Sequence, residues 1–187
     1  MKRLGTFLGL TLIAVGAVGA ARAAYDPLKA QLGQWLLDRA RADTQSGNPT
    51  RPWDWADITP VARISVPRLG VSAVVLGSAS GEAMAWGPGH VSGTASPGTP
   101  GLSAIAGHRD THLAFLAETK PGDEVFVETA NGLPHRYVVR EGLVVDSRHW
   151  TLPTRTDGPE KLVLVTCWPF DANFQGPLRF VLYAEPA

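Results

Sequence analysis

The chain has 187 residues, with 17 basic side chains, 17 acidic side chains and a single cysteine. The balanced charge argues against an electrostatically driven nucleic-acid-binding protein, because no basic excess is available to neutralise phosphates. A lone cysteine excludes an internal disulfide, a four-cysteine zinc site and a cysteine-ligated iron–sulfur cluster. The length accommodates one domain of ordinary size with an appendage.

Residues 1–24 have the pattern of a membrane anchor. Lys2 and Arg3 precede an uncharged stretch, residues 4–21, which as a helix spans about 27 Å and nearly matches a bilayer core. The positive charges favour a cytoplasmic N-terminus and export of the remainder. A cleaved signal peptide is the alternative, because Ala21-Arg22-Ala23 has the small-x-small form of a cleavage site.

A second helix is expected to start at Asp26 and Pro27, which suit the N-cap and the first helical position. Apolar residues then recur at helical spacing: Leu28, Leu32, Trp35 and Leu36. This pattern predicts an amphipathic helix to about residue 42 that packs on the domain or lies on a membrane. The predicted divisions are therefore 1–24, a helix and linker over 25–57, and a domain over 58–187.

From residue 58 onward, short apolar runs bounded by Gly, Pro, Asp or Asn indicate β-strands. The candidate strands are 61–66, 71–76, 102–106, 124–128, 136–141, 143–145, 161–166 and 178–184. No long helical pattern separates them, which argues against a parallel doubly wound sheet. We predict a mostly β fold, a single closed eight-stranded antiparallel barrel with short helices, and the competing architecture is a sandwich.

Two long connections interrupt the predicted strands, at residues 85–101 and 146–160. Segments of this length without regular structure are usually functional in a compact domain. They are candidates for the walls of a binding groove, with a purely structural role as the alternative. Residues 112–119 are expected to form one helical turn.

Cys167 ends the apolar strand KLVLVTC and is followed by Trp168-Pro169, which cannot continue a strand ladder. A thiol at a strand end is accessible, although a lone cysteine is commonly an inert core residue. A hairpin around 168–177 brings Arg179 opposite Cys167, where a guanidinium stabilises a thiolate or an oxyanion. The alternative is a surface arginine paired with Asp171 or Glu185.

A thiol nucleophile also needs an acid/base partner. His108 is favoured because it directly follows the strand GLSAIAG. The other histidines are His90, His112, His135 and His149. His108 and His112 have the i, i+4 spacing of a metal pair, but Arg109 stands where a zinc peptidase has its acid and no third ligand is evident. We therefore predict no metal.

Three segments resemble the sortase family of cysteine transpeptidases: AGHRD (106–110), LVLVTCWPF (162–170) and PLRFVLYAE around Arg179. The order of His, Cys and Arg and their spacing match the family's signature, and the resemblance covers about residues 52–185. PWDWAD (52–57), VARISVPRLGV (61–71) and PGTPGLSAIAGHRDTH (97–112) resemble the sortases of Gram-negative bacteria in particular.

The resemblance implies an eight-stranded barrel that cuts a C-terminal sorting signal of the LPxTG kind in a secreted protein. The acyl fragment is held as a thioester and passed to an amine acceptor. By position, Cys167 is the nucleophile, His108 the acid/base, Arg179 the support of substrate and oxyanion, and Thr166 an aid at the oxyanion. The resemblance implies no cofactor, and some sortases bind calcium through acidic clusters, of which none is evident here.

Together with the N-terminal segment, the resemblance predicts a single-pass inner-membrane protein whose catalytic domain faces the periplasm. Two other functions stay open. One is an L,D-transpeptidase-like cell-wall enzyme, although TCWPF does not match the SHGC-type context of that cysteine. The other is a non-catalytic exported barrel that binds peptides, which the presence of His108, Cys167 and Arg179 together disfavours.

Overall fold

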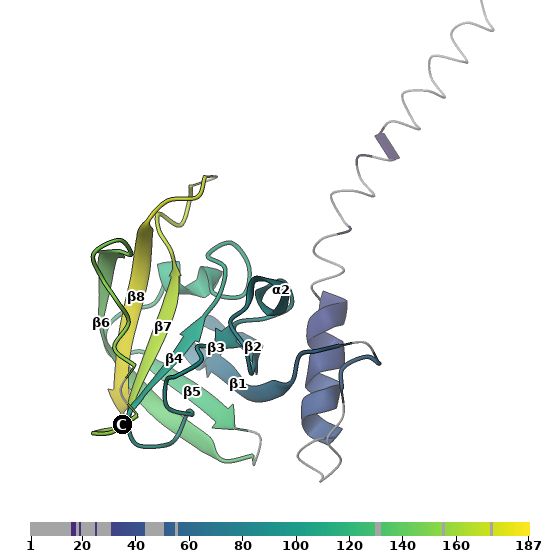
Figure 1. Cartoon of the computed structure of the whole chain (residues 1–187). Helices are drawn as coiled ribbons and strands as arrows, with labels where there is room; N and C mark the ends of the chain where they lie inside the picture. The colour runs from purple at the N-terminus through teal and green to yellow at the C-terminus, as the bar shows by residue number, and fades with distance from the viewer. Residues whose placement is uncertain are drawn as a thin grey trace, which may run out of the picture.

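The computed structural model (Figure 1) describes residues 16, 17, 19, 25, 31–43, 51–54, 56–129, 132–154, 156–172 and 174–187. The predicted anchor therefore lies largely outside the described residues, as does the predicted helix start at Asp26 and Pro27. Among the residues that are described, none belongs to a helix with the length and apolar character needed to span a membrane.

Eight strands form a closed barrel, which confirms the mostly β fold predicted from the sequence. They are β1 (Pro60–Val66), β2 (Val71–Leu76), β3 (Gly89–His90), β4 (Leu102–Ala106), β5 (Glu124–Thr129), β6 (Pro134–Asp146), β7 (Lys161–Cys167) and β8 (Leu178–Pro186). Their order around the barrel is β1-β2-β3-β4-β7-β8-β6-β5. Short helices η1 (Pro67–Leu69), α2 (Gly81–Met84) and η2 (Ala114–Ala117) lie in the connections.

The expectation of a purely antiparallel barrel is wrong for two pairs of strands. β2 pairs with β3 and β4 pairs with β7 in parallel, while the remaining neighbours are antiparallel. Parallel pairing needs a long crossover. For β4 and β7, the chain between them builds β5 and β6 before it returns in the same direction.

Two further details of the strand prediction are wrong. The sequence did not predict β3, because this strand has only two residues, Gly89 and His90, and carries no apolar pattern. The segments predicted as 136–141 and 143–145 form one strand, β6, which continues through Gly142. A Cβ at Gly142 would lie 2.5 Å from Cζ of Phe180, so the glycine makes room for that ring rather than ending a strand.

Alternation of side chains divides the strands between two apolar clusters. In β1 every second residue is buried, and in β7 Leu162 and Leu164 face the barrel interior. Val163 lies in a separate cluster with Val181 of β8, on the outer face of the same two strands. The barrel is therefore packed inside and also partly covered outside, on the face of β4, β7 and β8 toward which Val163 points.

The helix over residues 31–43 packs beside the barrel, against β2 and the segment that follows α2 (Figure 1). Leu37 is fully buried there with Val74 and Leu76. Gln34 clamps the contact, because its Nε2 donates to the Trp86 carbonyl (2.6 Å) and its Oε1 accepts from the Val74 amide (2.9 Å). Of the two predicted placements, the structure shows this helix packed on the domain.

The helix does not bury its predicted apolar face. Leu32 and Trp35 are 57% and 56% exposed, while Gly33 and Leu37 face the domain. A Cβ at Gly33 would lie 2.7 Å from Cε3 of Trp86. Because the helix approaches this indole closely, it turns the side that carries Gly33 toward the domain and leaves Leu32 and Trp35 facing away.

Gly89→Ala is expected to destabilise the fold by more than about 2 kcal/mol. A Cβ there would overlap the Ser78 carbonyl oxygen and lie 2.6 Å from Cα of Ala79, so backbone must move. Gly81→Ala is the matched control, because a Cβ at that helical position meets open space. Chemical denaturation measures both variants, and equal unfolding free energies for the two would contradict this account of β3.

Candidate active site

Cys167 and Arg179 meet at one end of the barrel. Cys167 is the last residue of β7 and pairs in register with Arg179, the second residue of β8. Both residues are half-buried. The connection between these two strands lies at the upper end of the barrel in Figure 1. The predicted hairpin is confirmed, and it sets Arg179 opposite Cys167 on the neighbouring strand.

The parallel pairing of β4 with β7 brings His108 to the same end. The register runs from Leu102 opposite Lys161 to Ala106 opposite Val165, and the Gly107 amide donates to the Val165 carbonyl (3.2 Å). β4 ends at Ala106, so His108 follows two residues later at the end of β7 that carries Cys167. His108 is exposed, so its imidazole is accessible at the rim.

Thr166 faces the other way from its neighbour Cys167. Successive side chains of a strand point to opposite faces, and Thr166 is only 2% exposed. Its Oγ1 donates to the Gly107 carbonyl (2.8 Å). The hydroxyl therefore ties β7 to the residue before His108, and its predicted part in supporting an oxyanion stays a prediction.

The Arg179 guanidinium is held at the rim by backbone oxygen. Its Nη1 donates to the carbonyls of Gly176 (2.6 Å) and Leu178 (2.9 Å). Glu185, one of the carboxylates considered as its partner, pairs instead with Arg140 (3.1 Å) and Lys161 (3.2 Å). Of the described contacts, none pairs Arg179 with a carboxylate, so its positive charge is not neutralised by an ion pair there.

Sequence reasoning assigned no role to Arg109, the residue after His108. Its Nη2 donates to the carbonyls of Ala172 (2.5 Å) and Phe174 (2.7 Å) in the connection between β7 and β8. Adjacency to His108 was the one signal in the sequence that could have singled it out.

An aromatic cluster follows the thiol. Trp168 stacks on Phe180 with ring centroids 6.0 Å apart, and Phe170 lies 5.3 Å from each of these rings. Phe174, farther along the same connection, is 63% exposed. Phe170 and Phe180 also pack against the interior apolar cluster, so the aromatic rings cover the barrel interior at the end where β7 finishes.

Both long connections predicted as groove walls lie on the outer face that carries Cys167. Val163 and Val165 share this face with Cys167, since residues two apart in a strand point the same way. Trp150 and Leu152 of the second connection pack there, and so does Val91 of the first. The two segments therefore border the outer surface of β7 and β8, as a groove requires.

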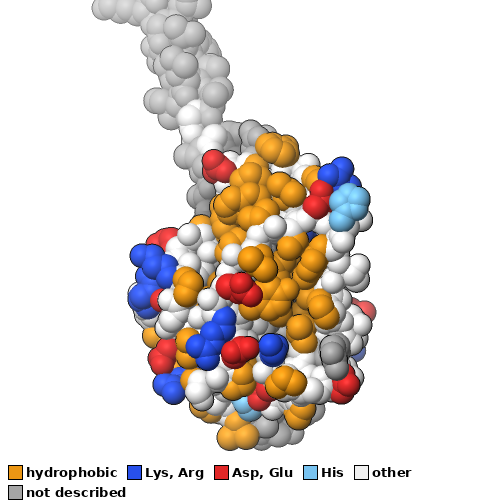
Figure 2. Space-filling view, turned by 90° about the vertical axis from the view of Figure 1, so that its left-hand side faces the viewer, with side chains coloured by type: hydrophobic (Ala, Val, Ile, Leu, Met, Phe, Trp, Pro, Cys, Tyr) orange, Lys and Arg blue, Asp and Glu red, His pale blue; other side chains and the backbone are white. Residues whose placement is uncertain are grey.

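A further apolar surface adjoins the site. Figure 2 shows the side of the molecule formed by β6 and β8, where hydrophobic side chains gather in a broad band. On β6, Leu143 and Val144 are 43% and 46% exposed, and Val145 pairs with Arg179. Exposed apolar side chains of β6 therefore lie one and two positions before the residue that pairs with Arg179.

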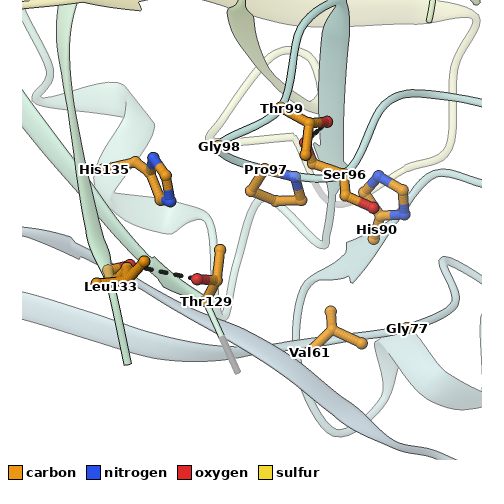
Figure 3. A pocket seen from close by; sticks show the side chains of 10 residues that line it. All are labelled: Val61, Gly77, His90, Ser96, Pro97, Gly98, Thr99, Thr129, Leu133 and His135. Atoms are coloured by element: carbon orange, nitrogen blue, oxygen red, sulfur yellow. Dashed lines mark hydrogen bonds between the residues drawn. The ribbon is translucent and has the colours of Figure 1, made fainter. Parts of the chain in front are cut away.

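His90 and His135 lie in another part of the barrel. They line a cavity of about 520 Å³ in which none of Cys167, His108 and Arg179 takes part, with the two rings on opposite sides of Pro97 (Figure 3). His90 Nε2 is within 2.9 Å of the Ala95 carbonyl and 3.1 Å of the Thr94 hydroxyl. These contacts give His90 a structural role.

His112 lies close to His108 and is half-buried. It lines a cavity of about 570 Å³ together with Gln34 and Trp35 of the 31–43 helix. Burial lowers the pKa of His112, and the nearby charge of His108 lowers it further. Over the described part of the chain, no group of three or more His, Cys, Asp or Glu side chains is arranged to hold a metal ion.

His112 predicts a specific dependence of stability on pH. An unfolded histidine takes up its proton near pH 6.5, whereas the lowered pKa of His112 keeps the folded protein from doing so until lower pH. The unfolded state therefore binds more protons, and the contribution of His112 to stability falls as the pH decreases below about 6.5. Denaturation at pH 7.5 and pH 5.5 should show a smaller loss in His112→Gln than in wild type. An equal loss of unfolding free energy in the two proteins would contradict this account of His112.

Comparison with known proteins gives one family. A model described as a sortase domain matches residues 64–187. Sortase D of Bacillus subtilis (strain 168) is 24% identical over 122 residues, which cover 65% of this chain and 61% of that protein. The match thus spans less than two thirds of this relative.

Solved structures share the fold. A Sortase D5 transpeptidase of Clostridium perfringens has a TM-score of 0.66 at 19% identity, covering 84% of this chain and 99% of that one. Sortase A from Corynebacterium diphtheriae has a TM-score of 0.62 at 19% identity, covering 92% and 95%. Sortase C of Clostridium perfringens, solved with the C-terminal cell wall sorting motif, has a TM-score of 0.60 at 18% identity, covering 85% and 89%. These relatives give no support to a special closeness to the sortases of Gram-negative bacteria.

Proposed function

This chain belongs to the sortase family, and we propose that it is a cysteine transpeptidase that transfers a secreted protein from its C-terminal sorting signal to an amine. The main support for the proposal is that Cys167 and Arg179 are paired across β7 and β8, and that His108 follows the end of β4 at the same end of the barrel. A nucleophile, a cation and an acid/base group are the parts that acyl transfer needs.

In the first half-reaction, Sγ of Cys167 attacks the carbonyl carbon of the scissile amide. The carbonyl oxygen becomes an oxyanion, which the Arg179 guanidinium stabilises through N–H groups other than the engaged Nη1. The tetrahedral intermediate then breaks its C–N bond, and His108 gives its proton to the departing amine. The products are a thioester on Cys167 and a free amine.

In the second half-reaction, the acceptor amine attacks the thioester carbonyl. Neutral His108 takes the proton that the amine loses, and the C–S bond breaks to return the thiolate. Water competes with the amine for the same carbonyl, so apolar cover over the thioester favours transfer over hydrolysis. Trp150 and Leu152 supply apolar surface on this side of the barrel.

The sorting signal is proposed to be of the LPxTG kind and to lie along the outer face of β7. The sortase C of Clostridium perfringens was solved with a C-terminal cell wall sorting motif, which supports a signal peptide as the substrate class here. The apolar side chains of the two long connections that pack on this face, Val91, Trp150 and Leu152, suit the leucine and proline of such a signal.

The protein is proposed to work at the inner membrane with its catalytic domain on the periplasmic side. The support is the sequence alone, in which Lys2 and Arg3 precede an uncharged apolar stretch. The assignment to the sortases of Gram-negative bacteria is likewise a proposal that rests on the motifs in residues 52–57, 61–71 and 97–112.

Product analysis tests the function. The protein is incubated with a library of LPxTG-like peptides in the presence and absence of triglycine, and the products are identified by mass spectrometry. The proposal expects cleavage after threonine and, with triglycine, a new amide product. A non-catalytic peptide-binding barrel would bind peptides without either product, and that result would refute the proposal.

A further inference from the structure

Two guanidinium groups hold the connection between β7 and β8 from opposite sides. Arg109, from the segment after β4, binds the carbonyls of Ala172 and Phe174. Arg179, from β8, binds the carbonyls of Gly176 and Leu178. The connection starts directly after Cys167, so both arginines act on the segment that continues from the nucleophile.

Arg109 also has a covalent link to the acid/base group, because it follows His108 in the chain. The turn that carries both is closed by the Leu113 amide, which donates to the His108 carbonyl (3.1 Å). A charged donor on two carbonyls is a strong contact. Fixing the Arg109 side chain on the connection therefore fixes the His108 backbone relative to the backbone that follows Cys167.

We propose that Arg109 is a positioning residue that sets the distance between the His108 imidazole and the Cys167 thiol. The inference rests on the proposed function and extends it to a residue outside the catalytic group. Thr166 links β7 to the end of β4 through the Gly107 carbonyl. Arg109 links the segment after β4 to the connection between β7 and β8. His108 and Cys167, the proposed acid/base group and nucleophile, lie next to these two contacts.

Only one terminal nitrogen of Arg109 makes these contacts. Nη2 donates to both carbonyls, while Nη1 is buried with no hydrogen-bond partner among the described residues. A lysine ammonium can therefore replace the contacting nitrogen in kind, whereas alanine and glutamine remove the charge. This difference makes Arg109→Lys a rescue variant, and a bidentate role would not allow such rescue.

The test uses peptides that differ in the leaving group. An amide needs a proton from His108 to release its amine, whereas a thioester of the same peptide releases a thiolate without one. Arg109→Ala is expected to lower kcat on the amide by about 10- to 100-fold, the size of a displaced catalytic group, with KM changed little. On the thioester, followed as the single-turnover rate of acylation because His108 also serves as base in the second half-reaction, the loss should be no greater than the loss in alkylation, about three- to tenfold, and Arg109→Lys should recover most of the amide activity.

Alkylation of Cys167 gives a readout that needs no peptide. Cys167 is the sole cysteine, and alkylation follows the thiolate, so iodoacetamide at neutral pH reports how well the imidazole meets the thiol. Arg109→Ala should slow alkylation about three- to tenfold, while Arg136→Ala, the loss of an exposed ion pair with Glu124 on the β5–β6 hairpin, should leave it unchanged. If Arg109→Ala fails to fold, Arg109→Gln takes its place.

Equal losses on amide and thioester, or alkylation equal to wild type in a folded Arg109→Ala protein, would overturn the positioning role. Absence of peptide turnover in the wild type, with alkylation still dependent on Arg109, would refute the proposed function and leave the positioning contact established. The two failures are thus distinguishable.

Discussion

Replacing Cys167 with alanine is expected to lower the rate of peptide cleavage by more than about 1,000-fold. The proposed reaction passes through a covalent bond to Sγ, and the structure offers no second thiol because the chain contains one cysteine. A residual rate from Arg179 and from binding of the peptide is expected, as for other enzymes that have lost a nucleophile. The measurement is cleavage of a fluorescent sorting-signal peptide under single-turnover conditions.

The control for this variant is its stability. Cys167 is half-buried at the end of β7, so loss of one sulfur leaves the barrel core unchanged. Thermal unfolding of Cys167→Ala is expected to match that of the wild type closely, with a change of about 1 kcal/mol or less. Cleavage at more than a tenth of the wild-type rate in the folded variant would remove Cys167 from the mechanism.

His108→Ala is expected to lower kcat by about 100- to 10,000-fold, the range associated with general acid–base catalysis. The structural reason is the parallel pairing of β4 with β7, which brings the segment after β4, with His108, to the end of β7 that carries Cys167. The matched control is His135→Ala, which removes an imidazole from the cavity that none of the three site residues lines. Steady-state kinetics of both variants decide the assignment.

A comparable loss in His135→Ala would show that histidine substitution harms the fold rather than the chemistry. Near-normal turnover in His108→Ala, with the loss found in a His112 variant instead, would move the acid/base role four residues along the chain. His112 lies near enough to His108 for their charges to interact, so this alternative is a physical one.

Local pattern predicted much of this protein, because strands and hairpins depend on nearby residues. The alternation in β1 and the apolar run of β7 were evident, and the Cys167–Arg179 pair followed from a short connection between neighbouring strands. The place of His108 was inferred from its position after a strand and from family resemblance. Its juxtaposition with Cys167 depends on a parallel pairing between strands far apart in the chain, which no local pattern encodes.

Other features could not be predicted for identifiable physical reasons. β3 is too short to show a period, and Gly142 reads as a strand end although it accommodates the ring of Phe180. The orientation of the 31–43 helix depends on how closely Gly33 approaches Trp86, which apolar spacing does not reveal. The inward direction of Thr166 was available in principle, because a residue next to an outward-facing cysteine must point to the other face.

Intact mass of the enzyme tests the central claim most directly. The full-length protein is mixed with a cleavable sorting-signal peptide, quenched in acid and measured before and after addition of triglycine. The account predicts a mass increase equal to the acyl fragment, mapped to Cys167 by peptide sequencing, and its loss to an amide product when triglycine is added. Peptide cleavage without an adduct on Cys167, or with the adduct on another residue, would contradict it.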